Sequence, residues 1–118
     1  MADFDAVTAS NGAKVTDIEA VRQLLKKYDI EGLEYGVTND GYFYVYGYDY
    51  FSVYTEENGY ATEEFLEELS TYLDEILVIQ SIGGEKCRFP LSATEIIITP
   101  AHLLKEGNST VEWNSFKN

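Results

Sequence analysis

Hydrophobic and polar positions along the chain follow two different periods, and each period predicts its own kind of element. Between residues 17 and 28, apolar side chains recur every three or four positions, which is typical of a helix with one buried face. Between residues 33 and 54 the period changes to two, which indicates β-strands. The apolar positions of the predicted helix are Ile18, Val21, Leu24, Leu25 and Tyr28.

Both ends of the predicted helix over 17–28 carry residues that favour them. Thr16-Asp17-Ile18-Glu19 matches a capping box, in which the Thr16 hydroxyl and the Glu19 carboxylate accept hydrogen bonds from free backbone N–H groups. Lys26 and Lys27 fall in the last turn, where the helix dipole favours positive charge.

The segment from Leu33 to Tyr54 predicts a three-strand antiparallel meander. Its first strand ends at Asn39-Asp40-Gly41, which is a strong hairpin signal. Tyr42 to Tyr48 then returns as a second strand rich in aromatic and β-branched residues. Gly47 indicates a bulge or bend before a third strand over Tyr50 to Tyr54.

A second helix, from Glu63 to Glu75, is predicted to follow, with Thr62 as its N-cap. Its buried stripe is Phe65, Leu66, Leu69, Tyr72, Leu73 and Ile76. Further strands are predicted over Leu77–Ile82 and Glu95–Thr99, with Gly83-Gly84 turning the chain between them and a return beginning at Lys86.

Together these elements predict a single two-layer α+β domain, with two helices packed on a mainly antiparallel sheet of five or six strands. A chain of 118 residues has room for one such domain. We expect residues 1–14 to be a flexible lead-in, 15–106 to form the domain and 107–118 to be a polar tail. In the tail, Val111, Trp113 and Phe116 alternate and could form a weak edge strand, through which a homo-oligomer could assemble.

Charge is distributed very unevenly along the chain. The protein has 21 acidic and 8 basic residues, for a net charge of −13. Residues 28–85 hold 14 of the acids and no Lys or Arg, so this segment alone carries −14. All ten tyrosines lie in the same segment, and carboxylates and aromatic rings therefore share one region.

This pairing of acids with tyrosines predicts a non-enzymatic module that binds a basic protein partner. The expected contact residues are the acidic helix and the tyrosine-rich strand: Glu63, Glu64, Glu67, Glu68, Tyr42, Tyr44, Tyr46 and Tyr48. The four glutamates form like-charge pairs four positions apart, which favours a cationic partner. Exposed tyrosine rows are common in protein interfaces.

Three alternatives remain open from the sequence. Carboxylates spaced over a tyrosine-bearing surface could imitate a phosphate backbone and inhibit a basic nucleic-acid-binding protein. Adaptation to high salt would also produce an acidic surface. Direct binding of nucleic acid is excluded, because the tyrosine-rich segment has no cations to neutralise phosphates.

The third alternative is a small enzyme that uses Cys87 or a pair of carboxylates. Cys87 lies between Lys86 and Arg88, whose charges could lower its pKa, and these two cations are also a weak candidate anion site. However, a catalytic cysteine normally needs a histidine base, and the single histidine, His102, lies beyond the next predicted strand. A buried structural Cys87 and cations that pair with the acidic segment are the favoured interpretations.

Other chemistries find no support in the sequence. One Cys and one His do not supply the ligands of an ordinary zinc site, and we expect no metal and no cofactor. Phosphate-binding glycine loops and nucleophile-elbow motifs are missing. The acidic N-terminus, the single cysteine and the absence of a long apolar stretch predict a cytoplasmic protein that has no membrane segment.

Overall fold

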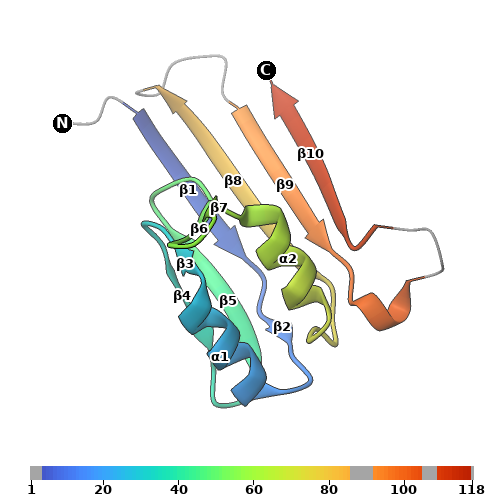
Figure 1. The fold of residues 1–118 in the computed structure, drawn as a ribbon. Helices are drawn as coiled ribbons and strands as arrows, with labels where there is room; N and C mark the ends of the chain where they lie inside the picture. Colours follow the sequence, from blue (N-terminus) through green and yellow to red (C-terminus); the bar gives the residue numbers. More distant parts are fainter. Residues whose placement is uncertain (1–3, 86–91, 105–108, 118) are drawn as a thin grey trace.

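A central sheet of seven strands forms the base of the molecule in the computed structural model, which describes residues 4–85, 92–104 and 109–117 (Figure 1). Six strands lie in the order β10-β9-β8-β1-β5-β2, with β1 and β2 along one edge of β5, and β4 pairs along the other edge of β5. All the strand pairs are antiparallel. The strands are Phe4–Ser10 (β1), Ala13–Lys14 (β2), Glu34–Val37 (β4), Tyr42–Gly47 (β5), Leu77–Glu85 (β8), Ser92–Ile98 (β9) and Val111–Lys117 (β10).

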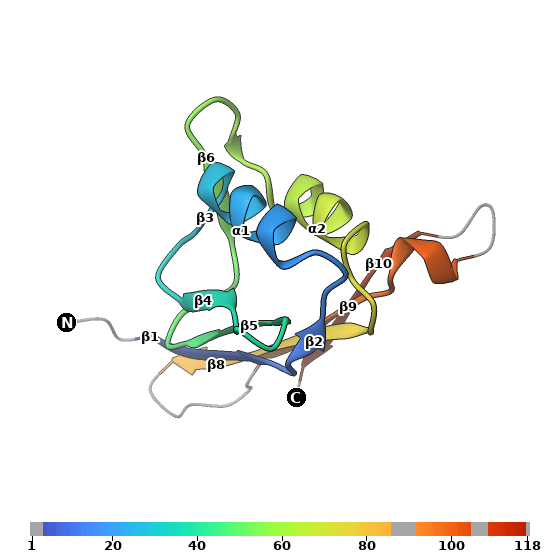
Figure 2. The same ribbon diagram turned by 90° about the horizontal axis from the view of Figure 1, so that it is seen from below.

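A second layer lies over one face of this sheet (Figure 2). It contains the helices Ile18–Lys27 (α1) and Thr62–Ser70 (α2). It also contains a small three-stranded sheet of Asp29–Ile30 (β3), Val53–Thr55 (β6) and Gly59–Tyr60 (β7). A short 3-10 helix, Ala101–Leu103 (η1), joins β9 to β10. The predicted α+β class, with two helices on an antiparallel sheet, is confirmed.

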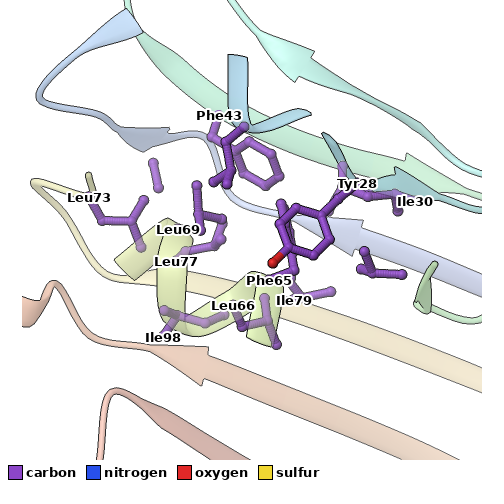
Figure 3. Packing of buried hydrophobic residues seen from close by; sticks show 14 of the residues in the cluster. Tyr28, Ile30, Phe43, Phe65, Leu66, Leu69, Leu73, Leu77, Ile79 and Ile98 are labelled. Carbon is purple, nitrogen blue, oxygen red and sulfur yellow. The ribbon is translucent and has the colours of Figure 1, made fainter. Parts of the chain in front are cut away.

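The core fills the space between the two layers (Figure 3). Phe43 and Val45 project into it from β5 because residues two apart on a strand face the same side. Phe65 lies at the centre. Its ring packs edge-on to the ring of Tyr28, with 5.2 Å between the ring centroids, and its centroid lies 6.5 Å from that of Phe43. Leu66 and Leu69 of α2 are fully buried beside it.

The predicted hairpin of β4 and β5 is confirmed. Val37 pairs with Phe43, and the Gly41 amide donates to the Thr38 carbonyl at 2.9 Å. Gly41 has a φ of 91°, a left-handed conformation that side chains with a Cβ rarely adopt.

The strand count is higher than the expected five or six because both ends of the chain join the sheet. The expectation of a flexible lead-in over 1–14 is corrected: β1 lies in the interior of the sheet, between β8 and β5. In β1 the small Ala6 and the polar Thr8 are buried while the apolar Val7 is exposed, so the hydrophobic pattern along the chain did not indicate a strand here. The tail supplies β10, which forms the expected edge strand along the whole of β9.

Four local expectations are corrected as well. Asp17, rather than Thr16, caps α1, since its carboxylate accepts from the Ala20 amide at 3.0 Å. Thr62 does not cap α2, because its hydroxyl accepts from the Val53 amide instead. The predicted third meander strand does not pair with β5, and its residues 53–55 pair with β3 and β7. Gly83-Gly84 continues β8 instead of turning it.

The acidic helix is also shorter than predicted. It ends at Ser70 rather than near Glu75, because the hydroxyls of Ser70 and Thr71 bond back to the carbonyls of Glu67 and Glu68. Ile76, expected in its buried stripe, is consequently exposed. Within the described ranges, no helix has both the length and the apolar character needed to cross a membrane.

Candidate binding cleft

The predicted tyrosine row occupies the sheet face that points away from the helices. Tyr42, Tyr44 and Tyr46 alternate along β5 with the buried Phe43 and Val45. The rings of Tyr44 and Tyr46 lie 6.0 Å apart. Tyr48 follows the end of β5 and is 88% exposed. Three of the four tyrosines therefore belong to the outer face of the seven-stranded sheet.

The four predicted glutamates lie in the other layer, on α2. Glu63, Glu64 and Glu67 are exposed, and no cation pairs with them among the described residues. Glu68 is half-buried and pairs with Lys27 of α1, with 3.5 Å between Nζ and Oε1. Since the sheet separates α2 from the tyrosine row, the eight residues do not form one continuous surface (Figure 2).

The remaining candidates do not assemble into a second site. Lys86, Cys87 and Arg88 lie outside the described residues. His102, in η1, is exposed, and its Nε2 lies 3.8 Å from the Asp74 carboxylate. In the part of the chain that the structure describes, no group of three or more His, Cys, Asp or Glu side chains could hold a metal ion.

Carboxylates and tyrosines instead meet in a cleft of about 820 Å³ at the edge of the helical layer. Its walls come from the last turn of α1, from β3 and β4, from the β6–β7 hairpin and from the first turn of α2. The lining residues are Leu25, Lys26, Lys27, Tyr28, Asp29, Tyr35, Tyr54, Thr55, Glu56, Glu57, Asn58 and Glu64.

Strand pairing brings the central acid and ring of the cleft together. Asp29 of β3 stands opposite Tyr54 of β6, and their neighbours Ile30 and Val53 point into the core. Tyr54 in turn stands opposite Tyr60 of β7, and the two rings pack edge to face at 5.6 Å. The Tyr35 hydroxyl reaches Asp29 from β4, at 3.5 Å. Asp29 and Tyr54 therefore share one outward face of the small sheet.

The turn of one hairpin and the start of α2 supply the other carboxylates. Glu56 and Glu57 lie in the turn of the β6–β7 hairpin, and both are exposed. Glu64 lies in the first turn of α2, where the positive end of the helix dipole favours an acid. The cleft thus has four carboxylates and three phenol rings against two lysines.

Lys27 shows how a cation is held at this site. Its Nζ lies 5.3 Å from the ring centroid of Tyr28 and 3.5 Å from the Glu68 carboxylate. An ammonium group within about 6 Å of an aromatic face is attracted by the ring quadrupole. The protein's own side chain therefore makes a combined cation–π and ion-pair contact at the rim of the cleft.

The surroundings of Tyr28 and Tyr35 in the cleft favour the neutral form of both phenols. Burial, a hydrogen bond to Glu68 and the charges of Glu68 and Glu64 together raise the pKa of Tyr28 far above its ordinary value. Burial and the negative charge of Asp29 raise the pKa of Tyr35. A neutral phenol presents its ring face to a cation and can still donate a hydrogen bond to a carboxylate.

Sequence reasoning identified Glu64 and missed the rest of the cleft. Tyr28 was assigned to the buried face of α1, and Tyr54 to a strand of the main sheet. The β3–β6 pairing that joins Asp29 to Tyr54 involves only two residues from each strand, and so short a ladder leaves no period in the sequence. The concentration of acids and tyrosines in residues 28–85 was the available signal, since most of the lining falls there.

Comparison with known proteins adds no further constraint on this cleft. No protein-family model, no curated protein and no solved structure matches the chain.

Proposed function

We propose that the protein is a non-enzymatic binding module that takes lysine and arginine side chains of a basic protein partner into the acidic, tyrosine-lined cleft. The observation that carries this proposal is the convergence of Tyr28, Tyr35 and Tyr54 with four carboxylates on one concave surface. Aromatic faces and carboxylates are the two groups that attract ammonium and guanidinium ions most directly.

The magnitudes favour a segment with several cations over a single free one. A cation–π contact contributes about 0.5–2 kcal/mol, and an exposed ion pair contributes about 0.2–1 kcal/mol. Because even a millimolar dissociation constant needs about 4 kcal/mol, one lysine held by one ring and one carboxylate binds weakly. A basic segment that also passes the exposed glutamates of α2 gains enough contacts for useful affinity.

The net charge supports the same function at long range. A charge of −13 steers a basic partner toward the protein, and the exposed Glu63 and Glu67 extend the field of the cleft along α2. The proposal sets this interaction in the cytoplasm, in line with the single cysteine.

A titration with short peptides tests the proposal. We expect a peptide rich in Lys and Arg to shift the amide resonances of Asp29, Tyr54 and Glu64, with an affinity that falls as salt rises from about 50 to about 500 mM. The same peptide with its cations replaced by Gln is the control. Equal binding of the two peptides, or shifts confined to the outer face of the sheet, would show that the cleft is not the site.

A further inference from the structure

The outer face of the seven-stranded sheet has no second layer over it among the described residues (Figure 2). Both helices and the small sheet lie on the other side. The strand register defines which side chains stand on this outer face, because residues directly opposite each other on paired strands point the same way.

One row of this face is apolar across four strands. Val7 of β1 stands opposite Ile82 of β8, Ile82 opposite Ala93 of β9, and Ala93 opposite Phe116 of β10. Val7, Ile82 and Phe116 are 49%, 54% and 56% exposed. Tyr46, 53% exposed, extends the apolar surface onto β5. Contiguous apolar surface of this kind marks an interaction site.

The acids of the protein largely avoid this face. The charged residues that the register places there are Asp5, Glu34, Glu95, Glu112 and Lys14. The acids of the cleft and of α2 lie in the opposite layer. A basic partner would therefore gain little on the outer face, whereas a second copy of this chain could approach there with both acidic layers turned outward.

We propose that the outer face is a homodimer interface, in which two copies stack sheet on sheet around a two-fold axis that runs along the strands between β8 and β9. Such an axis reverses the order of the row, so that Ile82 lies over the partner's Ala93 and Phe116 lies over the partner's Val7. Ile82, a large residue, then meets the small Ala93, as close packing of an isologous interface requires.

The overlap of the two copies suits a weak dimer. The axis stacks four strands of each copy, β1, β8, β9 and β10, so strands about 4.8 Å apart and residues about 3.3 Å apart give a flat footprint of roughly 19 by 23 Å. That area is on the order of 440 Å² per partner, and projecting side chains add to it, which is the range of weak interfaces that bury less than about 1,200 Å² in total. This inference goes beyond the proposed function, because it concerns the opposite side of the molecule.

Sedimentation equilibrium tests the proposal by comparing the association constant of the unaltered full chain with that of the Ile82→Lys variant, at up to about 100 μM. We expect the unaltered chain to dimerise and the variant to lose at least tenfold in association constant, with an unchanged circular dichroism spectrum. Leu103→Lys is the matched control, since Leu103 is an equally exposed apolar residue in η1, outside the outer face, and it should leave the dimer intact.

Salt separates this proposal from the cleft. Screening weakens the repulsion between two chains of net charge −13, so the dimer should persist or tighten at about 500 mM salt, whereas peptide binding in the cleft should weaken. A chain that stays monomeric at both salt concentrations overturns the proposal. A dimer that survives Ile82→Lys also overturns it and places the contact elsewhere, for example at the edge strand β10.

Discussion

Asp29 and Tyr54 stand directly opposite each other on β3 and β6, and a carboxylate and a phenol ring thereby share one outward face of the cleft. Their register is held from the core side by Ile30 and Val53, which pair next to them and are buried. The cleft therefore rests on the hydrophobic core rather than on a free loop, and its two central groups are positioned before any partner arrives.

The first prediction concerns the ring of Tyr54. Tyr54→Ala removes a cation–π face of about 1 kcal/mol, and we expect it to weaken binding of the Lys- and Arg-rich peptide about three- to tenfold. Isothermal titration calorimetry at low salt measures this change. Tyr46→Ala removes an equally aromatic side chain from the outer face and should leave the affinity within twofold. Equal losses in the two variants would contradict the assignment of the cleft.

The second prediction uses the two lysines that lie over tyrosine rings. Lys27→Met removes the intramolecular cation from the rim of the cleft, so the basic peptide should bind about two- to fivefold more tightly at low salt. Lys14→Met is the matched control: its Nζ lies 5.1 Å from the Tyr42 ring, it changes the net charge equally, and it lies on the other face. If both variants tighten binding equally, net charge alone explains the effect.

The Lys27–Glu68 pair itself should contribute little to stability. Both side chains are about half exposed, so water screens their attraction. We expect Lys27→Met to change the free energy of unfolding by less than about 1 kcal/mol. Urea denaturation followed by circular dichroism checks this, and a larger loss would mean that Lys27 also has a packing role.

The third prediction concerns the centre of the core. Phe65 is fully buried and contacts the rings of Tyr28 and Phe43, so Phe65→Ala should destabilise the protein by about 3–5 kcal/mol. Tyr48→Ala, at a site that is 88% exposed, should change stability by less than about 0.5 kcal/mol. The same urea experiment measures both variants. A small loss for Phe65→Ala would place the core elsewhere.

The fourth prediction is a pH dependence of stability. The pKa of Tyr28 is higher in the folded protein than in the unfolded chain, so the folded state keeps its proton above pH 10 while the unfolded chain loses it. The stabilisation from Tyr28 is therefore complete below the unfolded pKa and declines as pH rises above it, by up to about 1.4 kcal/mol per pH unit.

Tyr28→Phe isolates this contribution. Between pH 10 and pH 12 we expect the unfolding free energy of the variant to fall less steeply than that of the unaltered chain, while the lysines affect both equally. Parallel slopes would show that Tyr28 titrates normally.

The fifth prediction tests the corrected helix cap. Asp17→Ala removes the side chain that accepts from the Ala20 amide, and it should destabilise the protein by about 1 kcal/mol. Thr16→Ala should have a smaller effect, since the Thr16 hydroxyl donates to the Tyr72 carbonyl at an exposed site. Thermal unfolding of the two variants distinguishes them, and the opposite order would restore Thr16 as the cap.

Local signals in the sequence were sufficient for the elements that local interactions build. Helix α1 and the hairpin of β4 and β5 were predicted nearly to the residue, because an apolar stripe and a Gly41 turn act over a few positions. The class of the fold followed from these elements.

Long-range pairing could not be predicted in the same way. Nothing near β1 in the sequence indicates that it pairs with β8, and nothing near Asp29 indicates Tyr54. The prediction of one acidic, tyrosine-bearing surface treated proximity in sequence as proximity in space. Alternation along β5 places Tyr42, Tyr44 and Tyr46 on the outer face, whereas the tyrosines of the cleft, Tyr28, Tyr35 and Tyr54, come from other elements.

The placement of β1 also sets the order of events during folding. Thr8 and Ser81, which are 73 positions apart, share a hydrogen bond in the middle of the sheet. A nascent chain that has left the ribosome only as far as α2 still lacks β8, so β1 has no neighbour on that side. Closing such a long loop costs conformational entropy before the stabilising contacts between β1 and β8 form, so this step is slow. We expect α1 and the β4–β5 hairpin to collapse first, and β1 to be locked into place only when β8 arrives.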